Sequence, residues 1–246
     1  MNDIYLKKIR KYELIQVLSN LDISGKKTKI LDIGCGSGKQ IQILNSFGFN
    51  TFGIDIVKHK NLNDNKINFK KFDGVKIPFN KNEFNLVLMS HVLEHVIKKE
   101  SLINEIKRVL NDNGVLICVL PNHNWRLYTS ITHYFNIFKT VLFFKKKEEL
   151  IKKKLTKPKT EIIKNLFFSP KHGVIGNRFT EIYYFTPFFW KKFFKKNNFK
   201  LIKNYPSFIF YTGNINMGIF LKIKYRICIS FLFGSTSHIY ILKNDV

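Results

Sequence analysis

A glycine cluster between an apolar run and an amphipathic segment constrains the fold of this chain most. Residues 29–33 (KILDI) are typical of a buried strand, and the segment 34–38 (GCGSG) follows directly. Residues 40–47 then carry apolar side chains at helical spacing, with Gly48 as a stop signal. Such a strand, loop and helix let a ligand approach the backbone, whose free N–H groups can bind an anion. The spacing is G-x-G-x-G, not the G-x-G-x-x-G of dinucleotide enzymes.

Strands and helices alternate on both sides of this loop. A helix is predicted over residues 4–21, and another over 101–110 ends at turn signals in 111–114. Further strands are predicted at residues 50–56, 67–72, 84–89, 115–120, 199–204 and 238–242. Because strands that alternate with helices form parallel sheets covered on both faces, the sequence predicts an α/β fold.

Two aspartates stand where the strands after the loop end. Asp55 ends the strand 50–56, where a carboxylate can accept hydrogen bonds from both hydroxyls of a ribose. Asp73 follows the strand 67–72 and can accept a hydrogen bond from an adenine amino group. Simpler roles stay open: the glycines as a tight turn, Asp55 as a strand-end cap, Asp73 as a turn cap, and Asp32 as a residue that orients the loop.

Over about residues 28–122 the chain resembles the class I S-adenosylmethionine-dependent methyltransferases of the type 11 kind. Segment 31–38 (LDIGCGSG) is similar to their first motif, and 53–55 (GID) to their ribose-binding acidic turn. Segments 91–95 (HVLEH) and 110–116 (LNDNGVL) resemble later family segments. The resemblance implies a Rossmann-like three-layer sandwich, with a mostly parallel seven-stranded sheet, an antiparallel last strand and inserted helices after strand five.

The same resemblance implies that the chain is an enzyme with S-adenosylmethionine as its cofactor. The residues that bind the cofactor are then expected after the first four strands. They are Asp32, Gly34, Cys35, Gly36, Gly38, Asp55, Ile56, Asp73, Gly74, Ser90 and His91.

Two histidines are candidates for a general base. His91 and His123 follow the fourth and fifth predicted strands, at the edge where ligands bind in open parallel sheets. A neutral imidazole there can accept the proton of an acceptor hydroxyl during methyl transfer. The H-x-x-E-H spacing of residues 91–95 leaves a metal site as an alternative. Because adjacent Glu94 and His95 would point about 100° apart on a helix, helix capping is favoured and no metal is expected.

The acceptor is predicted from a looser resemblance. Residues 121–126, 132–134, 169–173 and 176–185 are similar to bacterial methyltransferases of surface-polysaccharide and related biosynthetic pathways. This resemblance implies a small or lipid-linked sugar hydroxyl, or another small metabolite, as the acceptor. The side chains expected to contact the substrate are His172, Asn177, Arg178 and Glu181. The alternative is a structural loop that only covers the site.

The net charge of +25 raises nucleic acid as a competing partner. All but five of the 42 basic residues are lysine, which genome composition can explain, whereas base recognition favours arginine. Residues 89–92 (MSHV) also lack the Pro-Pro motif that amino-methylating DNA enzymes carry after strand four. A nucleic-acid partner is therefore not expected. An RNA-directed methyltransferase and a non-catalytic methyltransferase-like protein stay as alternatives.

The chain is expected to form one methyltransferase domain. Its parts are a cofactor-binding core (22–122), an inserted lid and substrate region (124–185), and a C-terminal helix with the last strands (186–246). Three cysteines without a CxxC pair fit the reducing cytoplasm, and no signal peptide or membrane span is predicted. The aromatic and lysine-rich stretches 137–168 and 215–233 leave contact with the inner membrane face open.

Overall fold

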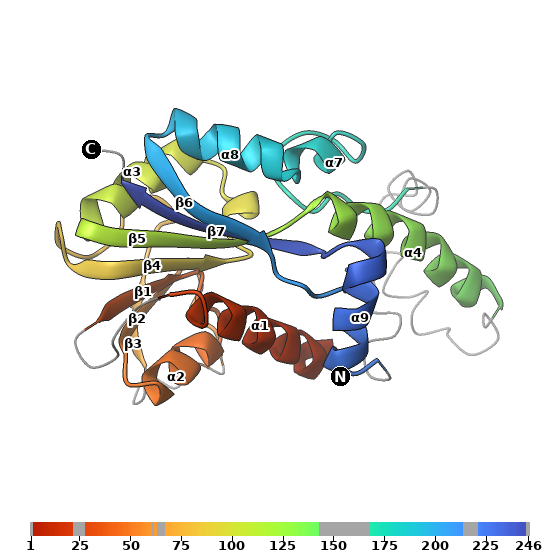
Figure 1. Ribbon diagram of the computed structural model, residues 1–246, viewed down its shortest axis with the longest axis horizontal. Coiled ribbons are helices and arrows are strands. Elements are labelled where there is room, and N and C mark those ends of the chain that lie inside the picture. The colour runs from red at the N-terminus through yellow and green to blue at the C-terminus, as the bar shows by residue number, and fades with distance from the viewer. Residues whose placement is uncertain are drawn as a thin grey trace.

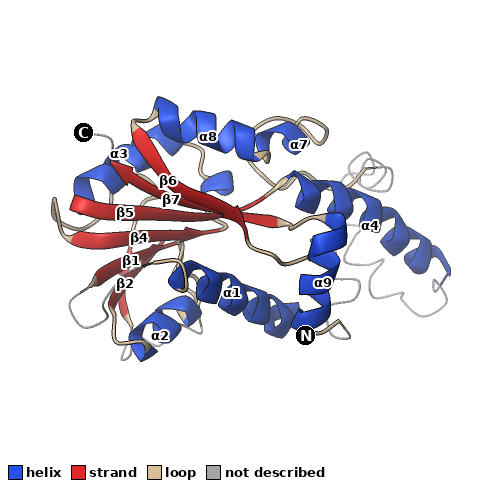
Figure 2. Ribbon diagram, in the orientation of Figure 1, coloured by secondary structure: helices blue, strands red, loops and turns tan. Residues whose placement is uncertain are grey.

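Seven strands form one sheet in the order β3-β2-β1-β4-β5-β7-β6 (Figures 1 and 2). The computed structural model describes residues 2–21, 28–60, 62, 67–142, 168–213 and 221–244. The strands are β1 (Lys29–Ile33), β2 (Asn50–Asp55), β3 (Asn68–Lys71), β4 (Phe84–Ser90), β5 (Leu110–Pro121), β6 (Phe199–Pro206) and β7 (Ser237–Asn244). Strands β1 to β5 pair in parallel, while β7 runs antiparallel to both β5 and β6. The predicted mostly parallel sheet with an antiparallel last strand is confirmed.

Helices cover both faces of this sheet (Figure 2). Helices α1 (Asn2–Leu18) and α2 (Lys39–Ser46) lie on one face, and α3 (Lys99–Val109) and α8 (Pro187–Lys196) on the other. Side chains alternate along the strands, so Ile30 packs with the first pair of helices and Leu31 with the second. Because both faces are buried, the strands read as continuous apolar runs.

The remaining helices gather at the carboxyl ends of the parallel strands (Figure 1). They are the short 3-10 helix η2 (Leu93–His95), α4 (His123–Leu142), α7 (Glu181–Tyr184) and α9 (Ile223–Phe233). None of the helices described is long and apolar enough to cross a bilayer. This end of the molecule therefore combines loops, short helices and strand ends, which is where a ligand site is expected in an open α/β sheet.

Local details of the fold add to the expectations from the sequence. The predicted turn at 111–114 is instead a bulge within β5, because Leu110 pairs with Phe84 and Val115 pairs with Leu86. The Thr186 hydroxyl caps α8, accepting the N–H of Phe189 at 3.2 Å. Much of the predicted inserted region, residues 143–167, and the first part of the stretch 215–233 lie outside the described residues.

Candidate functional site

The glycine loop after β1 leaves open space beside its backbone. Gly34, Gly36 and Gly38 have φ angles of +72°, +53° and +72°, which side chains rarely tolerate. A Cβ atom on Gly36 would meet nothing within 4 Å, whereas one on Gly34 would collide with Val92. The loop is therefore open at Gly36 and packed at Gly34 against the segment that follows β4.

Asp32 is a buried carboxylate that has no hydrogen-bond partner in the part of the chain that the structure describes. Its residue is 1% exposed, and neither carboxylate oxygen has a partner among the described residues. Burial, helped by the negative charge of Asp55, raises the pKa of Asp32 to about 8. Buried carboxylates are normally paired, so this one fits a cationic ligand group. S-adenosylmethionine carries such groups, and no hydrogen bond is seen by which Asp32 would orient the loop.

Asp55 and Asp73 hold backbone groups near their own strand ends. The Gly36 N–H donates to Asp55 Oδ2 at 2.9 Å, so the glycine loop and the end of β2 are in direct contact. Asp73 Oδ1 accepts the N–H groups of Val75 and Lys76 at 2.8 and 2.7 Å, which lowers the pKa of Asp73. Asp73 thus caps a turn, and its adenine contact stays a prediction.

The other predicted cofactor residues lie around these aspartates. Cys35 is buried beside Gly53, and Ser90 is the last residue of β4. Ile56 is exposed and lies 3.4 Å from the position that a Cβ atom on Gly74 would take. An open depression of about 480 Å³ adjoins this edge; its lining residues are Lys71, Phe72, Asp73, Lys76 and Pro78. Apart from Asp32, which lies within β1, the predicted cofactor positions therefore end or follow the first four strands.

His91 lies at the end of β4 in a buried polar network. Its backbone has φ +57°, an uncommon conformation for a residue with a side chain. Its Nε2 lies 3.2 Å from Glu13 Oε2 and 3.4 Å from the Tyr211 hydroxyl, and its Nδ1 lies 3.7 Å from Glu94 Oε1. Burial and the charge of Arg10 lower the pKa of His91 to about 4, so its imidazole is neutral.

The partners of His91 were not predicted from the sequence. Glu13 on α1 also accepts hydrogen bonds from Arg10 at 2.7 Å and from the Ser237 hydroxyl at 2.5 Å. Burial alone would raise the pKa of Glu13, but Arg10 and His91 outweigh it and leave the pKa at about 2. One signal was available: Glu13 is an acid four residues after Ile9 and four before Val17, both buried on α1.

His123 is the first residue of α4, just beyond β5. Its side chain is partly buried, and Nδ1 is shielded from solvent with no hydrogen-bond partner among the described residues. Burial lowers the pKa of His123, which favours the neutral imidazole. His123 Nδ1 is therefore unengaged by the described residues, whereas His91 Nε2 already bonds to Glu13.

The predicted substrate residues have different surroundings. Glu181 is fully buried; it accepts the N–H groups of His172 and Gly173 at 2.8 and 2.6 Å and pairs with Arg126 at 3.0 Å. Glu181 thus holds the chain through Oε1 and pairs with Arg126 through Oε2, and its contact with substrate stays a prediction. Arg126, equally buried, was missed from the sequence.

Two other predicted substrate residues lie on the surface of the same region. Asn177 Oδ1 accepts the N–H groups of Phe179 and Thr180 in a local turn. Arg178 donates to the carbonyl of Phe168 at 3.4 Å, and its own carbonyl accepts from Arg126. A substrate contact of Asn177 or Arg178 stays a prediction.

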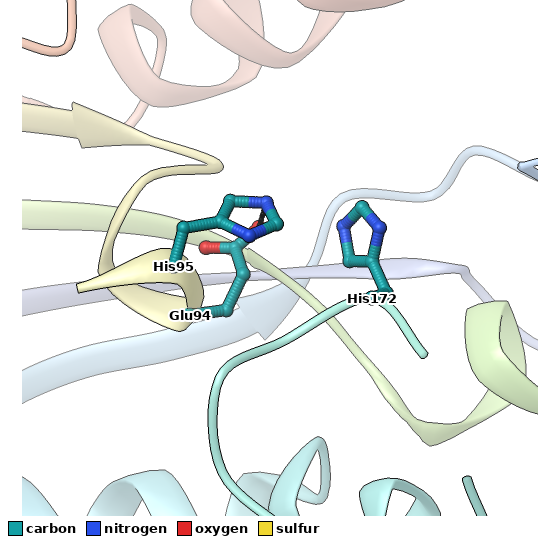
Figure 3. Close-up of side chains that lie close together, drawn as sticks. All are labelled: Glu94, His95 and His172. Carbon is teal, nitrogen blue, oxygen red and sulfur yellow. Dashed lines mark ion pairs between the residues drawn. The ribbon is translucent and has the colours of Figure 1, made fainter. Parts of the chain in front are cut away.

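Glu94, His95 and His172 form a cluster beside this network (Figure 3). One ligand atom from each of the three side chains lies within 4.8 Å of the others. Glu94 is buried, and neither of its oxygens accepts a hydrogen bond from the described residues, so the capping interpretation is wrong. The chain turns through η2 here, and it brings Glu94 Oε1 to 3.8 Å from His95 Nε2 despite their adjacency.

The strand order and the glycine loop define a class I methyltransferase fold. Residues 6–204 match the methyltransferase domain family, and the chain belongs to this family. S-adenosylmethionine is the cofactor of this class, so the cofactor prediction is confirmed. The geometry around Asp32 and Gly36 fits that cofactor.

Relatives cover only parts of this chain. An uncharacterised protein of Methanocaldococcus jannaschii is 35% identical over 54% of this chain and 59% of its own length. A ubiquinone biosynthesis O-methyltransferase of Pelagibacter ubique is 30% identical over 42% of this chain and 46% of its own. The chain thus spans about half the length of these curated relatives.

A solved structure extends the likeness over the whole fold. An S-adenosylmethionine-dependent methyltransferase from Mesorhizobium loti has a TM-score of 0.57, with 12% identity over 95% of this chain and 98% of its own. At that identity the likeness concerns the fold alone.

Proposed function

We propose that this chain transfers a methyl group from S-adenosylmethionine to a hydroxyl oxygen of a sugar or another small metabolite, including one carried on a lipid. The observation that carries the proposal is the buried, unpartnered carboxylate of Asp32 below an open glycine loop. In this plan residues 22–122 bind the cofactor, residues 124–185 cover the acceptor, and residues 186–246 complete the sheet. A ubiquinone biosynthesis O-methyltransferase among the relatives supports oxygen as the methylated atom.

Three residues of the cofactor side have distinct roles in this proposal. Asp32 compensates positive charge on the cofactor, and Asp55 accepts the ribose hydroxyls in place of its present bond to the Gly36 N–H. Gly36 leaves room for the cofactor beside the backbone. S-adenosylmethionine supplies an activated methyl group on a sulfonium.

His123 is the proposed proton acceptor. The acceptor oxygen forms a bond to the methyl carbon as the carbon–sulfur bond breaks, and the hydroxyl proton passes to the imidazole of His123. S-adenosylhomocysteine leaves neutral at sulfur. His91, whose Nε2 already bonds to Glu13, is proposed to position the segment that follows β4 against the cofactor. Since methyl transfer needs near in-line alignment, this positioning contributes to the rate.

The membrane contact left open by the sequence is included in the proposal. Exposed apolar side chains lie on α9 (Phe231 at 71% and Leu232 at 81%) and on α4 (Phe135 and Phe138). Lys222 and Lys224 lie at the opposite, N-terminal end of α9. A surface of this kind fits an anionic lipid headgroup layer. It would suit a cytoplasmic enzyme that works on a lipid-linked acceptor.

Calorimetric titration with S-adenosylhomocysteine tests the cofactor half, with NAD as the control ligand. Saturable binding is expected for the wild type. Asp55→Ala should weaken it about 100-fold, because two hydrogen bonds to a carboxylate are lost. The exposed Asp112→Ala at the opposite end of the sheet should bind as the wild type does. Absent binding of S-adenosylhomocysteine would reject the proposal.

Vesicle flotation tests the membrane contact separately. Vesicles that contain phosphatidylglycerol should carry the wild type, and F231S/L232S should reduce the bound fraction severalfold. Phe188→Ser changes an equally exposed side chain on α8 and should have no effect. Equal flotation of all three proteins would remove the membrane from the proposal.

A further inference from the structure

We propose that Glu94, His95 and His172 form a binding site for one divalent transition-metal ion, at the junction of η2 and the segment that carries His172. The ligand set is two imidazoles and one carboxylate. This set is common for Zn²⁺ and also suits Fe²⁺ and Mn²⁺, whereas Ca²⁺ and Mg²⁺ prefer oxygen ligands alone. The site is distinct from the aspartates and glycines that the proposed cofactor function uses.

The carboxylate of Glu94 is the first argument. The residue is 2% exposed, and both oxygens lack a hydrogen-bond donor among the described residues. The nearest ring nitrogens are those of His91 and His95, at 3.7 and 3.8 Å from Oε1. The Lys99 ammonium donates instead to the carbonyl of Val96. A buried carboxylate without a donor is costly unless a cation completes its surroundings.

The spacing of the three side chains is the second argument. Their ligand atoms lie within 4.8 Å of one another, and the rings of His95 and His172 are 4.6 Å apart between centroids. Ligands at about 2.1 Å around a tetrahedral ion are about 3.4 Å apart. Figure 3 shows the three side chains converging from two segments, so small side-chain rotations would close the site.

The scaffold behind His172 is the third argument. The backbone at His172 is held by hydrogen bonds, because Glu181 accepts the N–H groups of His172 and Gly173. The Val174 N–H then donates to the carbonyl of Glu94 at 3.1 Å. The ring itself packs against Trp125, with centroids 4.4 Å apart. Residues far apart in sequence are thus held together before any ion binds, which favours a specific site.

Three protein ligands leave a further coordination position. Structural zinc sites usually have four protein ligands, whereas sites with three keep one position for water or a substrate oxygen. The proposed ion would therefore link η2 to the segment 168–176 and still accept one small oxygen ligand. Binding of the ion can be measured without methyl transfer.

The experiment uses the full chain after treatment with a chelator. Titration with Co²⁺, followed by its visible absorption, should saturate at one equivalent, and Zn²⁺ should displace the Co²⁺. Glu94→Gln and His172→Ala should each weaken binding on the order of 100-fold. His95→Ala changes a partly exposed ring and should have the same effect with little change in folding. His59→Ala, an exposed histidine between β2 and β3, is the matched control.

Thermal unfolding provides the second readout. Zn²⁺ should raise the Tm of the wild type and of His59→Ala but not of His95→Ala, because only a folded site binds the ion. Wild-type protein that takes up no Co²⁺, or variants that bind it as the wild type does, would overturn the site. Asp55→Ala should bind the ion normally, so failure of this proposal is distinguishable from failure of the cofactor proposal.

Discussion

The two sides of the candidate site differ in how their polar groups are satisfied. On the cofactor side, at the ends of β1 and β2, Asp32 has no hydrogen-bond partner among the described residues and Gly36 faces open space. On the acceptor side, Glu13 on α1 bonds to Arg10, His91 and Ser237, and Glu181 pairs with Arg126. Glu94 beside this network is the exception, since neither of its oxygens has a hydrogen-bond donor among the described residues. The first side is assembled from segments close in sequence. The second joins residues more than 200 positions apart.

The cofactor side is therefore ready to bind a ligand, whereas the Glu13 network is stabilised by bonds within the protein. An unpartnered buried carboxylate costs free energy that a bound cation can recover. A fully paired network gains its stability without a ligand and fixes the segments it connects. We therefore expect changes on the cofactor side to alter affinity more than stability, and changes in the Glu13 network to do the opposite.

The largest effect is expected for Gly36→Val. A β-branched side chain would fill the open space beside the loop and should abolish measurable binding of S-adenosylhomocysteine in calorimetry. Gly48→Val is the matched control, because Gly48 also has a positive φ and no atom near its missing Cβ, but it follows α2 away from the loop. Both variants should lose similar stability. Unchanged binding of S-adenosylhomocysteine by Gly36→Val would show that the space beside Gly36 is not the cofactor site.

His123→Ala should lower the rate of methyl transfer about 100-fold, because the proposed proton acceptor is lost. Its affinity for S-adenosylhomocysteine should not change. Transfer of labelled methyl groups into a cell extract measures the rate, and His133→Ala on the same helix is the control. Since burial lowers the pKa of His123, the wild-type rate should decline only at a pH below the ordinary range of histidine. Unchanged turnover in His123→Ala would reject this base.

Glu13→Gln should destabilise the protein by about 2 kcal/mol at neutral pH, because the hydrogen bonds of Arg10 and His91 to a charged acceptor become bonds to a neutral amide. The folded-state pKa of Glu13, about 2, lies below its ordinary value. Its stabilising effect is therefore complete above the ordinary value and lost as the pH falls toward 2. Urea unfolding should therefore show a smaller difference in the free energy of unfolding between the wild type and Glu13→Gln at pH 3 than at pH 7.

Glu105→Gln is the control for this network. Glu105 pairs with Arg108 at 2.7 Å on a partly exposed surface, where such pairs contribute less than about 1 kcal/mol. If Glu105→Gln costs as much stability as Glu13→Gln, the buried network has no special role.

Asp32→Asn should have the smallest effect on affinity, about a tenfold loss for S-adenosylhomocysteine, since one charge is removed and the shape is kept. The folded-state pKa of Asp32, about 8, lies above its ordinary value. Ionising Asp32 therefore reduces stability as the pH rises from the ordinary value through 8. The cofactor-free variant should accordingly have a higher Tm than the wild type at pH 8. A lower Tm would show that Asp32 has a stabilising partner.

The sheet and the cofactor side could be predicted because their signals are local. The run from Lys29 to Gly38 contains a strand, its loop and the start of a helix, and Asp55 ends the next strand. Parallel strands place their carboxyl ends on one edge, so the order of segments alone brings these residues together. The bulge at 111–114 was read as a turn because its residues are typical of both.

The acceptor side was decided by tertiary structure. The sequence named His91 and His172 but not Glu13, Arg126 or Tyr211, whose partners lie far along the chain. It also disfavoured a metal, because two adjacent side chains on an ideal helix point apart, whereas η2 and a distant segment bring Glu94, His95 and His172 together.

The sequence by itself therefore determined the methyltransferase fold and the identity of its cofactor, since periodic apolar runs and glycine spacing act over a few residues. Only the tertiary structure decided which charges are paired, which carboxylates are left without a partner, and which histidines meet. Those outcomes depend on long-range packing, which one-dimensional spacing does not encode.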